Sequence, residues 1–88
     1  MKTKKETFAL VEAFVQENRN AHYRIAYSYV RNEQDALDIV QEATLKALRS
    51  IDRLREVQYL KTWFYRILVN TAVDFIRKHG RVTVMEEE

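Results

Sequence analysis

Three carboxylates recur at helical spacing in the middle of this sequence and are the first residues that could do chemistry. Asp35, Asp38 and Glu42 follow one another at intervals of three and four residues. Carboxylates can bind a metal ion or transfer a proton, but such sites usually also contain a histidine or other ligands. His22 and His79 both lie far from this group in the sequence. We therefore predict an acidic surface, and neither an enzyme nor a metal or cofactor site.

A second group of candidate residues mixes aromatic, basic and amide side chains in the last third of the chain. An aromatic ring can stack on an unpaired base, a guanidinium group can bind a phosphate, and an amide can read a base edge. This mixture is typical of a surface that binds a single strand, because a helix that reads the major groove is usually more polar. The candidate residues for binding a nucleic acid strand are Tyr59, Lys61, Trp63, Arg66, Asn70 and Arg77.

Length and composition limit the fold that positions these residues. The chain has 88 residues, no proline and one glycine, so we expect a single all-α domain. It has no cysteine, which excludes disulfides and thiolate chemistry and agrees with a cytoplasmic location. Glu12, Gln16 and Glu17 interrupt the apolar residues after the basic start, so we predict no signal peptide or membrane span. Residues 31–48 carry a net charge of −2 and residues 49–81 a net charge of +5, an asymmetry that suits a phosphate-binding surface.

Hydrophobic periodicity predicts a compact bundle of three helices, over residues 6–30, 33–50 and 60–79. Residues 51–59 have no clear period and are predicted to form an ordered loop. Asn32 is a suitable N-cap for the second helix, and Gly80 can adopt the left-handed cap that ends the third. The apolar side of the first helix comprises Phe8, Val11, Phe14, Val15, Ile25, Ala26 and Tyr29. Asn18 and His22 lie on the same side, so a bend is expected there, with His22 at the edge of the core.

The second and third helices each have an exposed face in addition to the face that packs in the core. A helical wheel places Ala36, Val40, Ala43, Ala47 and Ile51 in the core. The opposite side of this helix carries a stripe that comprises Asp38, Gln41, Glu42 and Leu45. In this stripe one apolar side chain lies among polar ones, an arrangement that suits docking of a basic partner helix. The third helix buries Leu60, Phe64, Ile67, Leu68, Thr71 and Phe75. Its far side carries Trp63, Arg66, Asn70, Val73 and Arg77, although Trp63 and Tyr65 are also compatible with the core edge. These patterns leave open a helical protein–protein adaptor that binds no nucleic acid.

Two strings of the sequence, DALDIVQEATLKAL and KTWFYRILVNTAVDFIRK, resemble region 2 of the sigma-70 family. The resemblance covers residues 20–82 and is strongest to the extracytoplasmic-function (ECF) branch, where the chain is similar to the SigV-like group. Its motifs are the acid-x-x-Gln-Glu run that begins at Asp38 and the run from Trp63 to Asn70. Both occur in the order and at the separation that the family has.

The resemblance implies a promoter-recognition domain of an alternative sigma factor, acting in transcription initiation in the cytoplasm. It implies that the stripe binds the clamp helices of the largest subunit of RNA polymerase. Residues 51–59 and the start of the next helix would receive the single-stranded non-template strand of the minus-ten promoter element, with one base flipped into a pocket. The DNA-binding residues that this implies are Arg53, Arg55, Gln58 and Tyr59 in the loop and Lys61, Trp63, Arg66, Asn70, Arg77 and Lys78 in the helix. The resemblance also implies regulation by an anti-sigma factor, and the domain would contact a membrane only indirectly, through that factor. No small-molecule substrate is expected.

Two departures from the family pattern lie in the matched region. Thr44 stands where the family usually has a large aromatic residue, and Leu68 with Val69 replaces smaller residues. We expect residues 1–82 to form the region 2 domain. Residues 83–88 would begin an acidic linker to a region 4 domain, which in complete family members reads the minus-thirty-five element and is absent from this sequence.

Overall fold

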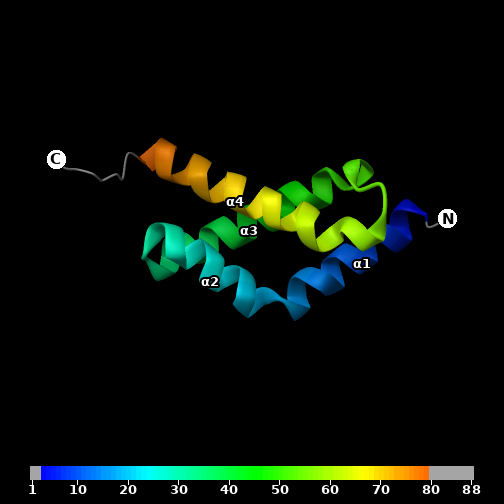
Figure 1. The fold of residues 1–88 in the computed structure, drawn as a ribbon, viewed down its shortest axis with the longest axis horizontal. Helices are drawn as coiled ribbons and strands as arrows, with labels where there is room; N and C mark the ends of the chain where they lie inside the picture. Colours follow the sequence, from blue (N-terminus) through cyan, green and yellow to red (C-terminus); the bar gives the residue numbers. More distant parts are fainter. Residues whose placement is uncertain (1–2, 80–88) are drawn as a thin grey trace.

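The computed structural model describes residues 3–79, which form four α-helices and two short 3₁₀ turns (Figure 1). The helices are α1 (Lys4–Glu17), α2 (Arg19–Val30), α3 (Glu33–Arg49) and α4 (Leu60–His79). The all-α class is confirmed, but the prediction of three helices is wrong, because the first predicted helix is two. None of the described helices is long and apolar enough to cross a membrane. The predicted cap at Gly80 and the predicted linker lie outside the described residues.

The break between α1 and α2 falls at Asn18, where the sequence predicted only a bend. The backbone there leaves the helical region, with φ −108° and ψ 18°. The side-chain Nδ2 of Asn18 donates to the carbonyl oxygen of Phe14 at 2.9 Å, alongside the backbone N–H of Asn18 at 3.1 Å. Such local side-chain bonds compete with the helix ladder. The two helices meet at an angle in Figure 1 and enclose the core from one side.

Both halves of the predicted first helix contribute to the core, but its ends do not. Val11 on α1 and Ala26 on α2 are fully buried. Phe8 and Tyr29, which the helical wheel placed on the same apolar side, are each 39% exposed. A single straight helix would have kept all of these residues on one face, so the break at Asn18 explains why the outer ones project into solvent.

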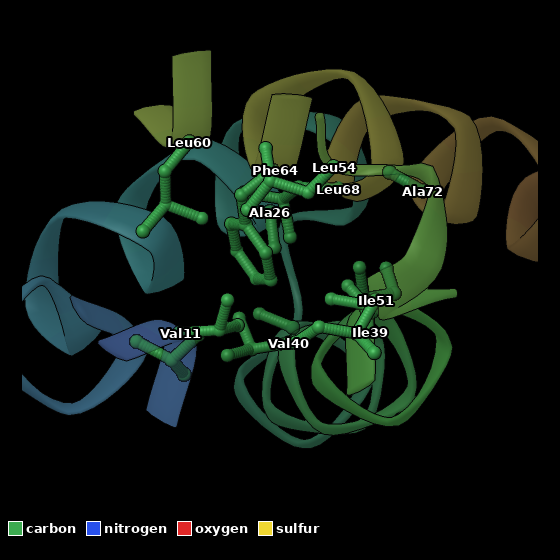
Figure 2. Close-up of a cluster of buried hydrophobic side chains, with 14 residues drawn as sticks. Val11, Ala26, Ile39, Val40, Ile51, Leu54, Leu60, Phe64, Leu68 and Ala72 are labelled. Atoms are coloured by element: carbon green, nitrogen blue, oxygen red, sulfur yellow. The ribbon is translucent and has the colours of Figure 1, made fainter. Parts of the chain in front are cut away.

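The predicted bounds of α3 and α4 agree with the structure. The Oδ1 atom of Asn32 accepts a hydrogen bond from the backbone N–H of Asp35 at 2.8 Å, which confirms the predicted N-cap of α3. Figure 2 shows Phe64 pointing from α4 toward Val11 and Val40. All five residues predicted for the core side of α3 are buried, and Ile39, which was not predicted, is fully buried as well.

The connection between α3 and α4 is ordered, as predicted, and is held by two buried side chains. It contains the 3₁₀ turns η1 (Ile51–Arg53) and η2 (Val57–Tyr59). Ile51 and Leu54 are 3% and 8% exposed and join the core cluster. The polar residues between them therefore stay at the surface, on a backbone that the core fixes in place.

Candidate functional site

The stripe predicted on α3 is exposed along its whole length. Asp38, Gln41, Glu42 and Leu45 all face solvent, and Leu45 is 47% exposed. The stripe forms a ridge between two grooves. One groove, of about 720 Å³, separates it from the end of α4, and the other, of about 500 Å³, separates it from the junction of α1 and α2. A ridge of this kind offers a partner helix an apolar contact with polar groups on either side.

Leu37 is an additional exposed apolar residue of this surface that sequence reasoning missed. It is 45% exposed and lines the groove of about 500 Å³ together with Leu45. The spacing of eight residues between the two leucines, with Gln41 midway, was the signal that could have identified it. Thr44 lies half-buried in the same groove, and its hydroxyl donates to the carbonyl oxygen of Val40 at 2.8 Å. A large aromatic residue here would fill part of this groove.

The carboxylates of the stripe make contacts that leave them at the surface. Gln34 Nε2 donates to Asp38 Oδ1 at 3.0 Å, and Glu42 forms an exposed ion pair with Lys46 at 3.5 Å. Among residues 3–79, no three His, Cys, Asp or Glu side chains are grouped to hold a metal ion. The arrangement suits recognition of a basic protein surface, since both carboxylates remain accessible to an incoming cation.

The predicted DNA-binding residues of the loop, and Lys61 at the start of α4, are all exposed. Arg53, Arg55, Gln58 and Lys61 are exposed, and Tyr59 is 57% exposed, the highest value for a large hydrophobic residue in the described chain. An exposed ring on an ordered turn, with cations nearby, can stack on an unpaired base. These five residues are therefore accessible to a nucleic acid strand.

The predicted residues of α4 differ in exposure and are spread along the length of the helix. Trp63 is half-buried and packs against the core, whereas Arg66 and Asn70 are exposed. Arg77 and Lys78 lie at the far end of α4, about 24 Å from Lys61 at 1.5 Å per residue. Both line the groove of about 720 Å³ that borders the acidic stripe. Arg77 also approaches Asp74 at 4.0 Å, in an exposed ion pair.

His22 is buried at the junction of α1 and α2, in agreement with its predicted place at the core edge. Its ring lies 4.6 Å from that of Phe64 and 5.6 Å from that of Phe14, measured between centroids. Burial lowers the pKa of His22 below its usual value, and its Nδ1 has no hydrogen-bond partner within the described residues. His22 is thus a neutral core residue and not part of either exposed surface.

Comparison with known proteins identifies the family. The family described as Sigma-70 region 2 matches residues 14–82, a span that begins six residues before the resemblance noted in the sequence. Over all 88 residues the chain is 48% identical to RNA polymerase sigma factor SigV of Bacillus subtilis, of which the match covers 53%. It is 47% identical over 47 residues to the ECF RNA polymerase sigma-E factor of Escherichia coli, covering 53% of the chain and 25% of that protein.

A third relative extends the same result, and solved structures add nothing to it. The chain is 30% identical over 71 residues to the ECF RNA polymerase sigma factor SigE of Mycolicibacterium smegmatis, covering 81% of the chain and 27% of that protein. No solved structure matches. The chain thus spans about half the length of SigV and about a quarter of the other two relatives. On these matches, this chain belongs to the sigma-70 region 2 family and is similar to sigma factors of the ECF group.

Proposed function

We propose that this domain joins RNA polymerase core to melted promoter DNA through two separate surfaces. The stripe of α3 binds the clamp helices of the largest polymerase subunit. The observation that carries this proposal is the 47% exposure of Leu45 on a helix whose opposite face is fully packed. An apolar side chain in the centre of a polar surface is the arrangement found at the centre of protein interfaces.

The loop of residues 51–59 and the start of α4 bind the non-template strand of the minus-ten element. Tyr59 supplies a stacking surface, and the neighbouring cations supply charge for the phosphates. Flipping a base out of a stack costs a few kcal/mol, and less where the base is already unpaired. A pocket on the loop would therefore hold the strand open and select the base in one step.

Further parts of the proposal rest on the family alone. The domain acts in the cytoplasm, where RNA polymerase works, and residues 1–82 form the region 2 unit of a longer sigma factor. An anti-sigma factor regulates it by covering one or both surfaces. A region 4 domain would supply the recognition of the minus-thirty-five element.

The polymerase surface is tested by the substitution Leu45→Asp. We expect the affinity for RNA polymerase core to fall by about 2 kcal/mol or more, roughly 30-fold, because a charge replaces the central apolar contact. The melting temperature should change little, since exposed substitutions usually alter stability within about 0.5 kcal/mol. Leu10→Asp on α1, where Leu10 is 38% exposed, is the matched control and should bind normally. Undiminished polymerase binding by Leu45→Asp would overturn this part of the proposal.

The DNA surface is tested by the substitution Tyr59→Ala. We expect weaker binding to single-stranded oligonucleotides that carry a minus-ten sequence, by about 1 to 3 kcal/mol, the usual value of one base–aromatic stack. The control is Tyr29→Ala, which removes a comparably exposed ring from α2. Equal affinities of the two variants, measured by fluorescence anisotropy, would contradict the proposal. Failure of the unaltered chain to bind single strands, alone or with polymerase core, would favour the adaptor alternative.

A further inference from the structure

One ion pair connects the start of α1 to the loop of residues 51–59. The Nζ atom of Lys4 lies 3.4 Å from Oδ2 of Asp52 on η1, although the two residues are 48 positions apart in the sequence. The other ion pairs within residues 3–79 each lie inside a single helix. The start of α1 and the connection between α3 and α4 occupy the same end of the molecule (Figure 1), and α1 packs against η1.

The core holds only the inner side of this loop. Ile51 and Leu54 point into the core cluster, whereas Asp52 between them is exposed. The ion pair with Lys4 is the only side-chain hydrogen bond or ion pair that residues 51–59 make within the described part of the chain. On the outer side of η1, α1 is therefore the element that can restrain the loop.

A capping box fixes Lys4 at the first position of α1. The Oγ1 atom of Thr3 accepts a hydrogen bond from the backbone N–H of Glu6 at 3.1 Å, and Glu6 Oε1 accepts one from the backbone N–H of Thr3 at 2.8 Å. A cation at this position is opposed by the positive end of the helix dipole. The helix itself therefore does not favour Lys4, whereas the carboxylate of Asp52 does.

Stabilisation of α1 is the simplest alternative role for Asp52, because a carboxylate near a helix N-terminus offsets the dipole. The two side chains of the pair are 69% and 75% exposed, and such pairs add little to stability. Residues 4–13 of α1 also precede residue 14, where the match to the family begins. The alternative requires that loss of the pair changes α1 alone and leaves the reading of bases by the loop intact.

We propose that α1 holds the loop of residues 51–59 in the conformation that receives a promoter base, with Lys4 and Asp52 as positioning residues. Neither residue contacts the base; together they restrain the outer side of η1 against α1. This inference rests on the proposed function and adds to it a restraint from outside the matched span. Because coupling between two sites is reciprocal, binding of a strand to the loop must also hold α1 in place.

Asp52→Asn separates positioning from charge. Removal of a carboxylate near a phosphate-binding surface should strengthen binding to every strand alike if charge alone matters. If Asp52 positions the loop, the preference among single-stranded oligonucleotides that differ at one minus-ten base should fall by about two- to fivefold, the range that corresponds to one exposed ion pair. Phosphate contacts carry no sequence information, so this preference, measured by fluorescence anisotropy, reports on the loop.

A charge exchange tests whether the two residues act as a pair. Lys4→Glu should lower the base preference as Asp52→Asn does, and the double variant Lys4→Glu with Asp52→Lys should restore it, because the ion pair forms again in reverse. Lys5→Glu is the matched control, since Lys5 is exposed and has no ion pair within residues 3–79. Addition of the strand should raise the hydrogen-exchange protection of α1 in the unaltered chain and in the double variant, and raise it less in Lys4→Glu.

The outcomes distinguish this inference from the proposed function. Full base preference in both Asp52→Asn and Lys4→Glu, in a chain that otherwise discriminates between bases, would overturn the inference while the proposed function stands. A double variant that stays as unselective as Lys4→Glu would overturn it as well. Absence of strand binding by the unaltered chain, alone and with polymerase core, would overturn the proposed function and the inference together.

Discussion

At the scale of single residues, His22 is a buried polar side chain whose ring keeps a nitrogen without a hydrogen-bond partner in the described part of the chain. It is 7% exposed, lies against two phenylalanine rings, and has an Nδ1 atom without a hydrogen-bond partner in residues 3–79. Burial disfavours the charged imidazolium and lowers the pKa of His22 in the folded state. The neutral form fits the core, so protonation must oppose folding.

This burial predicts a loss of stability at mildly acidic pH. The unfolded chain takes up a proton on His22 near the usual pKa of about 6.5, whereas the folded chain does so only at lower pH. Between these two values the unfolded state binds more protons, so the free energy of unfolding falls as the pH falls. Urea denaturation of the unaltered chain at pH 7.5 and 5.5 should show this decrease.

His22→Leu isolates the effect of this group. Leucine has a similar volume and no orphan nitrogen, so the variant should be at least as stable at pH 7.5 and should lose less stability at pH 5.5. His79→Gln, at an exposed histidine, should keep the sensitivity of the unaltered chain. An identical loss on acidification in the unaltered chain and in His22→Leu would contradict the assignment.

At the scale of elements, the connection from α2 to α3 depends on a strained residue. Arg31 has φ 52° and ψ 35°, in the left-handed region, and its N–H donates to the carbonyl oxygen of Tyr27 at 2.7 Å. It is the one described non-glycine residue with positive φ. A side chain with a Cβ atom pays about 1 kcal/mol or more there, which glycine avoids.

Two substitutions at Arg31 should change stability in opposite directions. Arg31→Gly removes the Cβ atom and should raise the free energy of unfolding by about 0.5 kcal/mol. This net value allows for the greater conformational entropy of glycine in the unfolded chain, which offsets part of the gain. Arg31→Val places a β-branched residue in the same conformation and should lower the free energy of unfolding by about 1 kcal/mol. Both variants lose the same positive charge, and their melting temperatures are compared by thermal unfolding. An equal shift of the melting temperature in both variants would show that the charge of Arg31, and not its backbone conformation, determines stability here.

The sequence predicted helices well where the apolar period and the caps agreed. Asn32 and the period of the following residues defined α3, and the α4 range of 60–79 agrees with the structure. The sequence predicted a bend near Asn18 but not a complete break, because asparagine is tolerated within helices and the period continues through it. In the structure the side chain donates to the carbonyl oxygen of Phe14, a local bond that competes with the helix ladder.

The site was predictable in its residues more than in its arrangement. Exposure of Leu45 and Tyr59 followed from helical wheels and composition, and both are exposed in the structure. The position of Arg77 beside the acidic stripe did not follow, because it depends on how α4 crosses α3. The same crossing brings Arg49 next to Asn70, a pairing between residues 21 positions apart that no local pattern contains.

At the scale of the whole molecule, burial is divided unequally among the helices. The buried residues of α1 are Val11 and Val15, whereas α3 and α4 each bury five residues. The ion pair that ties the start of α1 to η1, Lys4 with Asp52 at 3.4 Å, is 69% and 75% exposed at its two side chains and adds little. We infer that α1 can detach while α3 and α4 stay packed.

This inequality predicts two levels of amide protection in native-state hydrogen exchange. The free energy of a local opening depends only on the contacts that the opening segment loses. The amides of α1 should therefore exchange with a lower opening free energy than those of α3 and α4. The fully buried Ile39 lies away from Val11 in the core (Figure 2). Ile39→Val should therefore lower the protection of the slowest amides of α3 and α4 by about 0.5 to 1.5 kcal/mol, the usual cost of this truncation.

The amides of α1 should keep their protection in Ile39→Val, because a state with α1 detached still contains the packing around residue 39. The matched variant Val11→Ala should lower the protection of all four helices. The contacts of Val11 are lost when α1 detaches and also when the whole domain unfolds, so the substitution makes both openings easier. Exchange resolved by NMR at single amides measures both patterns. Equal losses in α1 and α3 for Ile39→Val would mean that the four helices open together, as one cooperative unit.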